Sequence, residues 1–355
     1  MPRRKKTLSP HVLFLLLFFA AAFLWTLASL PSNEDSVLNS AMLQHMDQNP
    51  PEAREMRLHG IGRNQSIVFV HVGKTGGETI QWRIKLSCKL RRNALMKEEC
   101  FEHFQGEESF LSQATVGYLH CDKLKPKGSL KNSTAFMVSI RNPIDRIISW
   151  FQYMHPGNCV PNRPSAACNL KKDNSPWGIN FYKICFPAID DFVKAMVVST
   201  VKGSTGCSAL ALETVQGRGP EGPSNHMYFN YFYYANATIY RFPHRNVLAV
   251  RQEMLWDDLR SIESYLGGDP HRPFERQGPT ITHGSEQFRY RASLDPKLVL
   301  RLCCTIPKEI ETYKYILERA VNLDVRQKSN SLKGVLSKCG AVSIDDLRTK
   351  CTELH

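Results

Sequence analysis

The segment IVFVHVGKTGG, residues 67–77, decides the fold class of this chain. Its first six residues are mostly β-branched or aromatic, and three glycines follow within the next five positions. This pattern is typical of a buried parallel strand that ends in a tight turn. Ile80, Ile84 and Cys88 then recur every four residues, which predicts one face of a helix that begins close to Thr75. The segment therefore predicts a strand, a glycine-rich turn and a helix.

A second unit of the same kind follows at residues 135–149. The run AFMVSI, residues 135–140, is strand-like, Asn142 can cap a helix, and Pro143 suits the first helical turn. The apolar face of the predicted helix consists of Ile144, Ile147, Ile148 and Phe151. Two strands that each lead into a helix predict an α/β fold, in which helices flank a parallel sheet and ligands bind at the carboxyl ends of the strands.

The glycine-rich turn is a candidate phosphate-binding loop. Its glycines expose backbone N–H groups, the helix N-terminus adds partial positive charge, and Lys74 and Thr75 supply a cation and a hydroxyl. It is not a Walker A motif, because the Lys-Thr pair comes before the glycine pair. In isolation, such a loop is more often a tight turn without a ligand.

The second unit favours the interpretation of the turn as a phosphate-binding loop. Arg141 stands at the carboxyl end of the second predicted strand, and Ser149 follows eight residues later, about two helical turns on. Arg141 can fork onto a phosphate while Ser149 donates a hydroxyl to it. Two phosphate sites at neighbouring strand ends predict a ligand that carries two separated phosphate groups.

The composition limits the class of partner. The chain has 355 residues and a formal net charge of +13, and its hydrophobic content of 42% excludes a wholly disordered chain. Only 22% of the residues are charged, and the 21 Gly and 20 Pro residues follow no short period, which excludes collagen-like, coiled-coil and low-complexity architectures. The positive charge favours an anionic partner: nucleic acid, an acidic glycan, a nucleotide or a membrane surface. Nucleic acid is disfavoured by the compartment that the N-terminus predicts.

The N-terminus predicts a membrane anchor. A basic cluster at residues 3–6 precedes an uncharged, mostly apolar run at 11–30, and Glu34 and Asp35 follow. This predicts a cytoplasmic tail at 1–10, a transmembrane signal-anchor at 11–30 and a type II orientation. A cleaved signal peptide is the alternative. Both interpretations place the rest of the chain in a lumenal or secreted compartment.

The remaining chain is interpreted as a lumenal stem at 31–63, a folded domain at 64–322 and an unassigned tail at 323–355. Helices are predicted at 190–201 and 306–322, and the aromatic run at 228–234 is interpreted as core. In a lumenal chain three sequons are glycosylation candidates, at Asn64, Asn132 and Asn236.

Eleven cysteines fit a chain with structural disulfides. The adjacent pair Cys303 and Cys304 is expected to bond to two different partners. The sequence contains no CxxC pair and no HExxH motif, so no metal site is expected.

The motifs HVGKTGG, residues 71–77, and RNPIDRIIS, residues 141–149, resemble the two cofactor-binding motifs of Golgi carbohydrate sulfotransferases, especially the heparan sulfate 2-O- and 6-O-sulfotransferase type. The resemblance covers residues 66–155 and is thin beyond them. It implies a P-loop-like, sulfotransferase-type sheet, a Golgi membrane location, 3′-phosphoadenosine 5′-phosphosulfate as co-substrate and a glycan or polysaccharide as acceptor. It also implies a 3′-phosphate site at Arg141 and Ser149. The 5′-phosphosulfate site would consist of Gly73, Lys74, Thr75, Gly76, Gly77 and Thr79.

The resemblance also suggests catalytic residues. Lys74 would neutralise the charge on the leaving oxygen, and His120, in GYLHCD at 117–122, is similar to the Gly-x-His segment that supplies the general base. Histidines at 155 and 283 are the alternatives, whereas His71 is expected to pack on the sheet. The family usually has a small or hydroxylated residue at the position of Glu78, which puts a ligand role for this carboxylate in doubt and leaves it as a further candidate base.

Two other functions stay open. A lumenal nucleotide-dependent kinase would use similar phosphate-binding loops, but it needs a carboxylate ligand for Mg²⁺ after an apolar strand, and the sequence offers no convincing candidate. A non-catalytic glycan-binding membrane protein would be expected to carry clustered basic runs, whereas the basic residues here are dispersed. The acceptor, whose contacts are expected from residues 159–236, and the oligomeric state are not predicted.

Overall fold

The computed structural model describes residues 66–77, 79–80, 115–119, 128–159, 167–168, 178–198, 206–217, 225–267 and 289–354. The chain divides into two compact units, Met1–His59 and Gly60–His355, and all described residues belong to the second unit. The predicted anchor and stem lie outside the described residues. Among the helices of the described ranges, none is both long and apolar enough to cross a bilayer.

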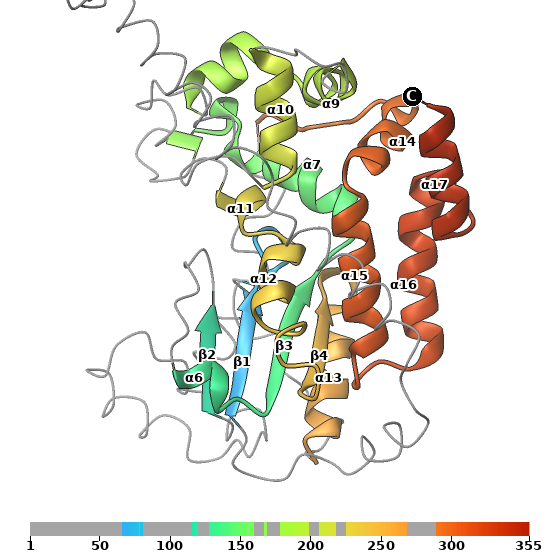
Figure 1. The fold of residues 1–355 in the computed structure, drawn as a ribbon. Helices are drawn as coiled ribbons and strands as arrows, with labels where there is room; N and C mark the ends of the chain where they lie inside the picture. The colour runs from blue at the N-terminus through green and yellow to red at the C-terminus, as the bar shows by residue number, and fades with distance from the viewer. Residues whose placement is uncertain are drawn as a thin grey trace, which may run out of the picture. The chain divides into compact units, whose positions relative to one another are not determined.

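The described unit is built on a parallel sheet of four strands in the order β2-β1-β3-β4 (Figure 1). The strands are β1 (Ser66–His71), β2 (Thr115–Leu119), β3 (Ala135–Ile140) and β4 (Asn246–Arg251). Because all pairs are parallel, the four carboxyl ends meet at one edge of the sheet. The predicted α/β class with a parallel sheet is confirmed.

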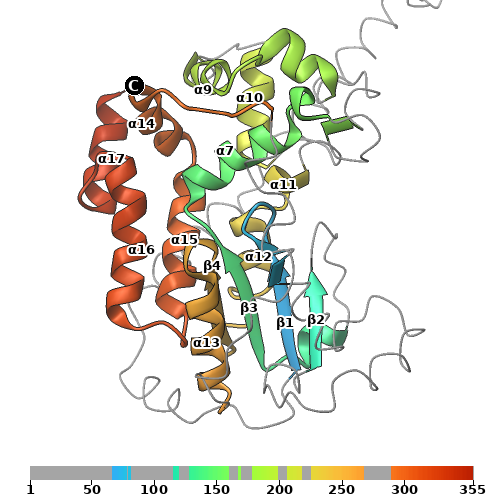
Figure 2. The same ribbon diagram turned by 180° about the vertical axis from the view of Figure 1, so that it is seen from behind.

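Side chains alternate between the two faces of the central strands. Ile67 and Phe69 belong to one hydrophobic cluster, and Val68 and Val70 belong to the other. The first cluster is covered by α13 (Leu255–Tyr265), which lies behind the sheet in the view of Figure 1 and in front of it in Figure 2. The sheet is thus buried on both faces, as a parallel sheet requires.

The helix α7 (Pro143–Met154) begins where the sequence predicts it. The side chain of Asn142 accepts a hydrogen bond from the backbone N–H of Ile144 at 3.0 Å, and Pro143 occupies the first turn. Ile147 and Phe151 are fully buried on the side of the helix that faces the core. Capping and amphipathic packing therefore fix the position of the helix that follows β3.

Further helices cover the other face of the sheet and its carboxyl edge. The predicted helix at 190–201 is observed at 189–198, and the aromatic run at 228–234 contributes Phe229, Tyr231 and Tyr234 to the core, as predicted. The remaining elements before the tail are α6 (Gly128–Lys131), η2 (Pro156–Asn158), η3 (Phe181–Cys185), α9 (Ile189–Val198), α10 (Cys207–Val215), α11 (Asn225–Tyr228), α12 (Tyr231–Ala237), η4 (Gln252–Met254), α14 (Pro296–Thr305) and α15 (Pro307–Arg319).

The C-terminal tail forms two more helices, α16 (Val325–Lys338) and α17 (Ile344–Glu353). The helix predicted at 306–322 ends at Arg319, because the next residues run beside β4 instead of continuing the helix. There Asn322 accepts a hydrogen bond from the Ala249 N–H and donates one to the Ala249 carbonyl, at 2.8 and 3.0 Å.

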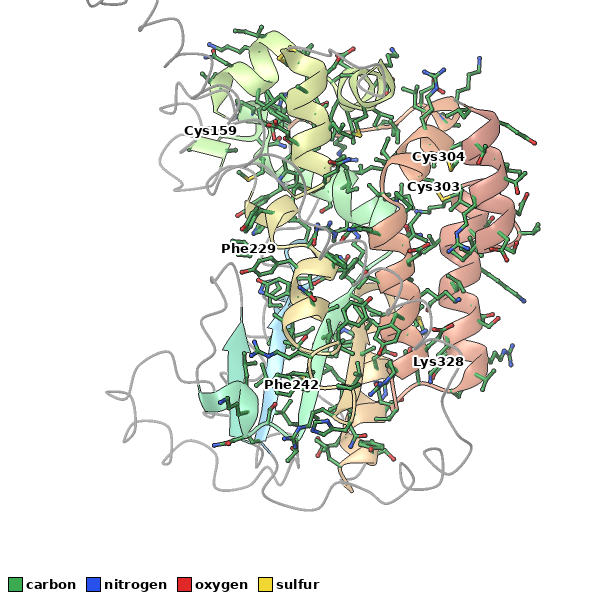
Figure 3. The ribbon with its side chains drawn as sticks, viewed as in Figure 1. Cys159, Phe229, Phe242, Cys303, Cys304 and Lys328 are labelled. Carbon is green, nitrogen blue, oxygen red and sulfur yellow. A yellow bond between two sulfur atoms is a disulfide. The ribbon has the colours of Figure 1, made fainter. Side chains whose placement is uncertain are left out.

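Four disulfides join cysteines of the described unit. Cys303 bonds to Cys339 and Cys304 bonds to Cys351, so the adjacent cysteines have different partners, as predicted (Figure 3). These two bonds connect α14 to both tail helices. The other two are Cys159–Cys168 and Cys185–Cys207.

Candidate functional site

The loop after β1 is shaped by close contacts that leave no room for side chains at two glycines. A Cβ atom at Gly77 would lie 1.9 Å from the ring of His71, and one at Gly73 would lie 2.5 Å from the ring of His226. Lys74 has a φ of 69°, in the left-handed region that favours glycine. Backbone N–H of Thr79 donates to the carbonyl of Gly76 at 3.1 Å, so helical structure begins within the loop.

The buried side chain of Thr75 ties this loop to the neighbouring strand. Its hydroxyl donates to the carbonyl of Val72 at 2.6 Å and lies 2.6 Å from the hydroxyl of Ser139 on β3. Both hydroxyls are inaccessible to solvent. The bonds fix the loop after β1 relative to the end of β3, and they engage the Thr75 hydroxyl with the sheet edge.

Arg141 follows β3 and is held by its backbone. Its N–H donates to the hydroxyl oxygen of Tyr231 at 2.8 Å, and the same hydroxyl donates to the Arg141 carbonyl at 2.7 Å. Burial raises the pKa of Tyr231, so its hydroxyl stays protonated and able to donate. The Arg141 side chain reaches the loop after β1, where it donates to the carbonyl of Lys74 at 3.4 Å.

The guanidinium of Arg141 is partly buried, and burial lowers its pKa. Within the described ranges, Arg141 takes part in no ion pair. Removal from water without a carboxylate partner disfavours a charged group. An anion that bound to Arg141 would compensate the guanidinium for the hydration that it loses on burial.

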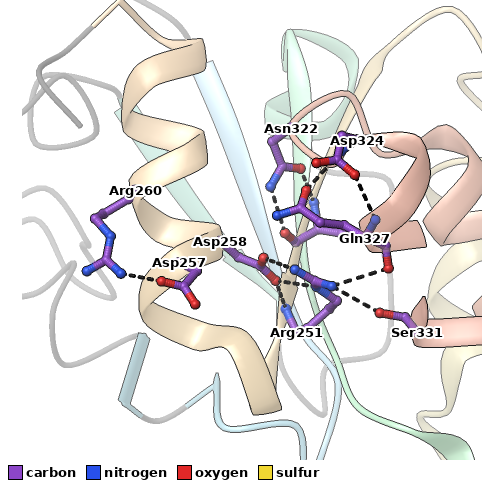
Figure 4. A network of polar contacts seen from close by, with 9 residues as sticks. Arg251, Asp257, Asp258, Arg260, Asn322, Asp324, Gln327 and Ser331 are labelled. Atoms are coloured by element: carbon purple, nitrogen blue, oxygen red, sulfur yellow. Dashed lines mark hydrogen bonds and ion pairs between the residues drawn. The ribbon is translucent and has the colours of Figure 1, made fainter. Parts of the chain in front are cut away.

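A pocket of about 520 Å³ opens beside Arg141, between the start of α7, η4 and α16. Three cations line it, but two of them have carboxylate partners. Lys338 pairs with Asp145 at 2.5 Å. Arg251 binds both carboxylate oxygens of Asp258 at 2.5 and 2.8 Å (Figure 4). Arg141 is the lining cation that lacks an ion pair among the described residues.

Ser149 lies on α7 and is partly buried. It precedes Tyr153 by four residues, so the two side chains project from the same face of the helix. The Lys74 ammonium nitrogen lies 3.6 Å from the centroid of the Tyr153 ring. The helix face that carries Ser149 is therefore the face that meets the loop after β1.

The predicted base, His120, and the further candidate base Glu78 lie outside the described residues, as do His283 and Asn64. The strand β2 ends at Leu119, one residue before His120, at the same edge of the sheet as the other three strands. Of the remaining sequons, Asn132 and Asn236 are exposed.

Two histidines near the loops have packing roles. His71 is buried at the end of β1 and stacks with Phe69, as predicted. His155 follows α7, accepts a hydrogen bond from the Gly157 N–H at 3.0 Å and stacks on Tyr290 with ring centroids 3.5 Å apart. Burial lowers the pKa of His155, which favours its neutral, accepting form.

A buried ion pair that was not predicted from the sequence supports both loops. Arg146 lies within the RNPIDRIIS motif, binds Glu309 at 2.9 Å and donates to the carbonyl of His226 at 2.8 Å. Glu309 in turn accepts from the backbone N–H groups of Tyr231 and Phe232. The signal was a second arginine in the motif, on the side of the predicted helix opposite Ile144, Ile147, Ile148 and Phe151. Its partner, 163 residues away, could not be identified from spacing.

Comparisons of the chain with protein-family models, with curated proteins and with solved structures found no match. The described ranges contain no group of three or more His, Cys, Asp or Glu side chains that could hold a metal ion. The site is therefore defined by its geometry and not by a relative. It consists of a glycine-rich loop with Lys74, which is joined through Thr75 and Ser139 to the strand end that carries Arg141. Such an arrangement can bind phosphate-type anions at two places.

Proposed function

We propose that this chain is a carbohydrate sulfotransferase, which transfers a sulfuryl group from 3′-phosphoadenosine 5′-phosphosulfate to a hydroxyl of a glycan in the Golgi lumen. One observation carries the proposal. Arg141 is a partly buried cation that forms no ion pair among the described residues, and it lies beside the glycine-rich loop of Lys74. The pairing of the two sequence motifs with this geometry supports a nucleotide that has a phosphate at each end.

In this proposal the two loops hold opposite ends of one nucleotide. Gly73 to Thr79 would bind the 5′-phosphosulfate mainly through backbone N–H groups, since the Thr75 hydroxyl is engaged with Ser139. Arg141 and Ser149 would bind the 3′-phosphate. The buried Thr75–Ser139 contact keeps the two sites at a fixed separation, which favours a ligand of matching length.

The reaction would be an in-line displacement at sulfur. The acceptor hydroxyl oxygen forms a bond to sulfur as its proton passes to a general base, for which His120 is the candidate. The bond between sulfur and the bridging oxygen breaks, and its electron pair stays on that oxygen as part of the 5′-phosphate. Lys74 would stabilise the negative charge that grows there.

Calorimetry on the full chain tests the nucleotide site. We expect 3′-phosphoadenosine 5′-phosphate to bind in the presence of EDTA, and 5′-AMP to bind more weakly because it lacks the group that Arg141 would hold. Arg141→Ala should weaken binding by about 1.5–3 kcal/mol, the worth of hydrogen bonds to a charged group. Arg260→Ala, which removes an exposed arginine on α13, is the matched control and should bind normally. Binding that requires Mg²⁺ would favour the kinase alternative, and equal affinity for 5′-AMP would contradict a 3′-phosphate site at Arg141.

Activity is tested with radiolabelled sulfate donor and a panel of desulfated glycans. Incorporation into one acceptor class would identify the substrate. His120→Ala should reduce turnover by about 10²–10⁴-fold while leaving product-nucleotide affinity nearly unchanged, and Lys74→Ala should impair both. Nucleotide binding without transfer to any glycan would point to a different acceptor, such as a protein tyrosine.

The proposed lumenal location has its own test. The exposure of Asn132 and Asn236 is compatible with glycosylation. Expression with microsomes should give a glycosidase-sensitive product whose C-terminal part resists added protease. Complete digestion of an unglycosylated chain would contradict the type II orientation.

A further inference from the structure

We propose that Tyr153 is a positioning residue for Lys74, and that its aromatic ring holds the lysine ammonium in the orientation in which it meets the 5′ end of the nucleotide. The inference rests on the proposed function and extends it to a residue outside both sequence motifs. The observation behind it is the stack of three side chains from three segments: Lys74 of the loop, Tyr153 of α7 and His226 of α11.

The first contact is between the cation and the ring. The Lys74 ammonium nitrogen lies 3.6 Å from the Tyr153 ring centroid, well inside the range of about 6 Å within which a cation is attracted to an aromatic face. The ring lies on one side of the ammonium, which carries three N–H donors. This geometry is compatible with a simultaneous hydrogen bond to a phosphate oxygen.

The second contact fixes the ring itself. His226 stacks on Tyr153 with ring centroids 6.0 Å apart and an angle of 29° between the planes. The same imidazole lies against the loop, where a Cβ atom at Gly73 would be 2.5 Å from it. His226 therefore touches both the ring and the residue that precedes Lys74.

A third contact, between Arg146 and the backbone of His226, anchors the stack to the core. The carbonyl of His226 accepts a hydrogen bond at 2.8 Å from Arg146, which is fully buried and paired with Glu309. Arg146 and Tyr153 are seven residues apart on α7 and so lie on one face of it. A free lysine side chain samples many rotamers, whereas this one is held by groups that are connected to a rigid helix.

The decisive experiment compares ligands that do and do not reach Lys74. In the full chain, Tyr153→Leu should weaken binding of 3′-phosphoadenosine 5′-phosphate about three- to tenfold, and Tyr153→Phe, which keeps the ring, should restore it. Binding of adenosine 3′-phosphate, which lacks the 5′ group, should change less than twofold. In a Lys74→Met background, Tyr153→Leu should have no further effect.

A matched control removes the ring from a second cation–ring pair. Lys308 lies 4.6 Å from the ring centroid of Phe232, so Phe232→Leu makes the same kind of change at another site, and it should leave binding of both nucleotides within twofold. Equal losses for the two nucleotides in Tyr153→Leu, or a full loss in Tyr153→Phe, would show a general structural role and overturn the proposal.

A second measurement needs no nucleotide and separates this inference from the proposed function. In protein labelled with ¹³C-lysine, the ε-methylene signal of Lys74, assigned through Lys74→Arg, should carry a ring-current shift in the native chain and in Tyr153→Phe. The shift should vanish in Tyr153→Leu. An unshifted native signal would overturn the inference even if the nucleotide binds, whereas a shifted signal in a chain that binds no nucleotide would reject only the proposed function.

Discussion

Arg141 and Arg251 stand at the carboxyl ends of two neighbouring strands and line the same pocket, yet they have opposite surroundings. Arg251 is the last residue of β4, opposite Ile140 of β3, and binds the buried Asp258 through three hydrogen bonds. It also donates to the Ser331 hydroxyl at 3.1 Å. Burial lowers the pKa of Arg251, but the bonds to Asp258 and its charge outweigh this and raise the pKa overall. For Arg141, burial dominates and the pKa is lowered.

The difference shows that a basic residue at the carboxyl end of a parallel strand does not by itself indicate an anion site. Both arginines follow strand-like runs in the sequence, in SIR and AVR. The partners decide between the roles. Arg251 has a carboxylate of its own and joins β4, α13 and α16, whereas the binding role proposed for Arg141 depends on its having no such partner among the described residues.

The largest effect should come from breaking the Arg251 pair. Arg251→Ala leaves the fully buried Asp258 without its partner, so we expect a loss of about 3–5 kcal/mol in the free energy of unfolding, measured by urea denaturation. The double variant Arg251→Met/Asp258→Leu should recover much of the loss, because an apolar pair of similar volume replaces the ion pair. A single variant of native stability would show that Arg251 is not structural.

The next effect concerns α16, which supplies Ser331 to Arg251. The Cys303–Cys339 disulfide closes a loop of 36 residues around this helix. Cys303→Ala/Cys339→Ala should lower the free energy of unfolding by about 2–4 kcal/mol, in line with the entropy of closing such a loop. Nucleotide binding by the folded protein should persist, because the Arg141 backbone is held by Tyr231 and not by α16. If the folded double variant no longer bound the nucleotide, this would show that the tail helps to form the nucleotide site.

Arg141 should show the reverse behaviour of Arg251. We expect Arg141→Ala to change the free energy of unfolding by less than about 0.5 kcal/mol, since no ion pair among the described residues is lost. It should nevertheless weaken nucleotide binding, as stated above. A variant that loses stability as well as binding would make Arg141 a second structural arginine and remove the contrast with Arg251.

The smallest expected effect comes from removing one negative charge from the pocket. Glu253 lines the pocket, and its charge acts on Arg141. Glu253→Gln removes a negative charge near the proposed phosphate, so affinity for 3′-phosphoadenosine 5′-phosphate should rise a few-fold, by roughly 0.5–1 kcal/mol at low salt. The gain should shrink as salt is added. A loss of affinity would indicate that Glu253 itself contacts the nucleotide.

Local features of the fold were predictable because short-range physics determines them. The run at 135–140 matches β3 residue for residue, and the Asn142 cap and Pro143 are found as predicted. A buried strand needs a continuous apolar run, and a helix needs a capping side chain at its start, and both requirements can be recognised within a few residues.

The partners of the site residues were not predictable, because they come from distant parts of the chain. Tyr231 lies 90 residues from Arg141, and Ser331 lies 80 residues from Arg251. Neither contact has a local signal in the sequence, and the aromatic run at 228–234 indicated only that Tyr231 lies in the core. The tail helices were also not predicted, although Asp324 and Ser343, which cap α16 and α17, are local signals. The disulfides that connect these helices to α14 cannot be assigned from spacing alone.

The left-handed backbone at Lys74 implies a trade-off between stability and activity within one residue. A side chain costs about 1–2 kcal/mol in this region, and glycine would avoid the cost. Lys74→Gly should therefore yield a protein at least as resistant to thermal unfolding as the native chain. This variant would lack the ammonium group that is proposed to stabilise the leaving oxygen. Under the sulfotransferase proposal, directed evolution for heat resistance alone is expected to remove this lysine, whereas selection for turnover is expected to restore it.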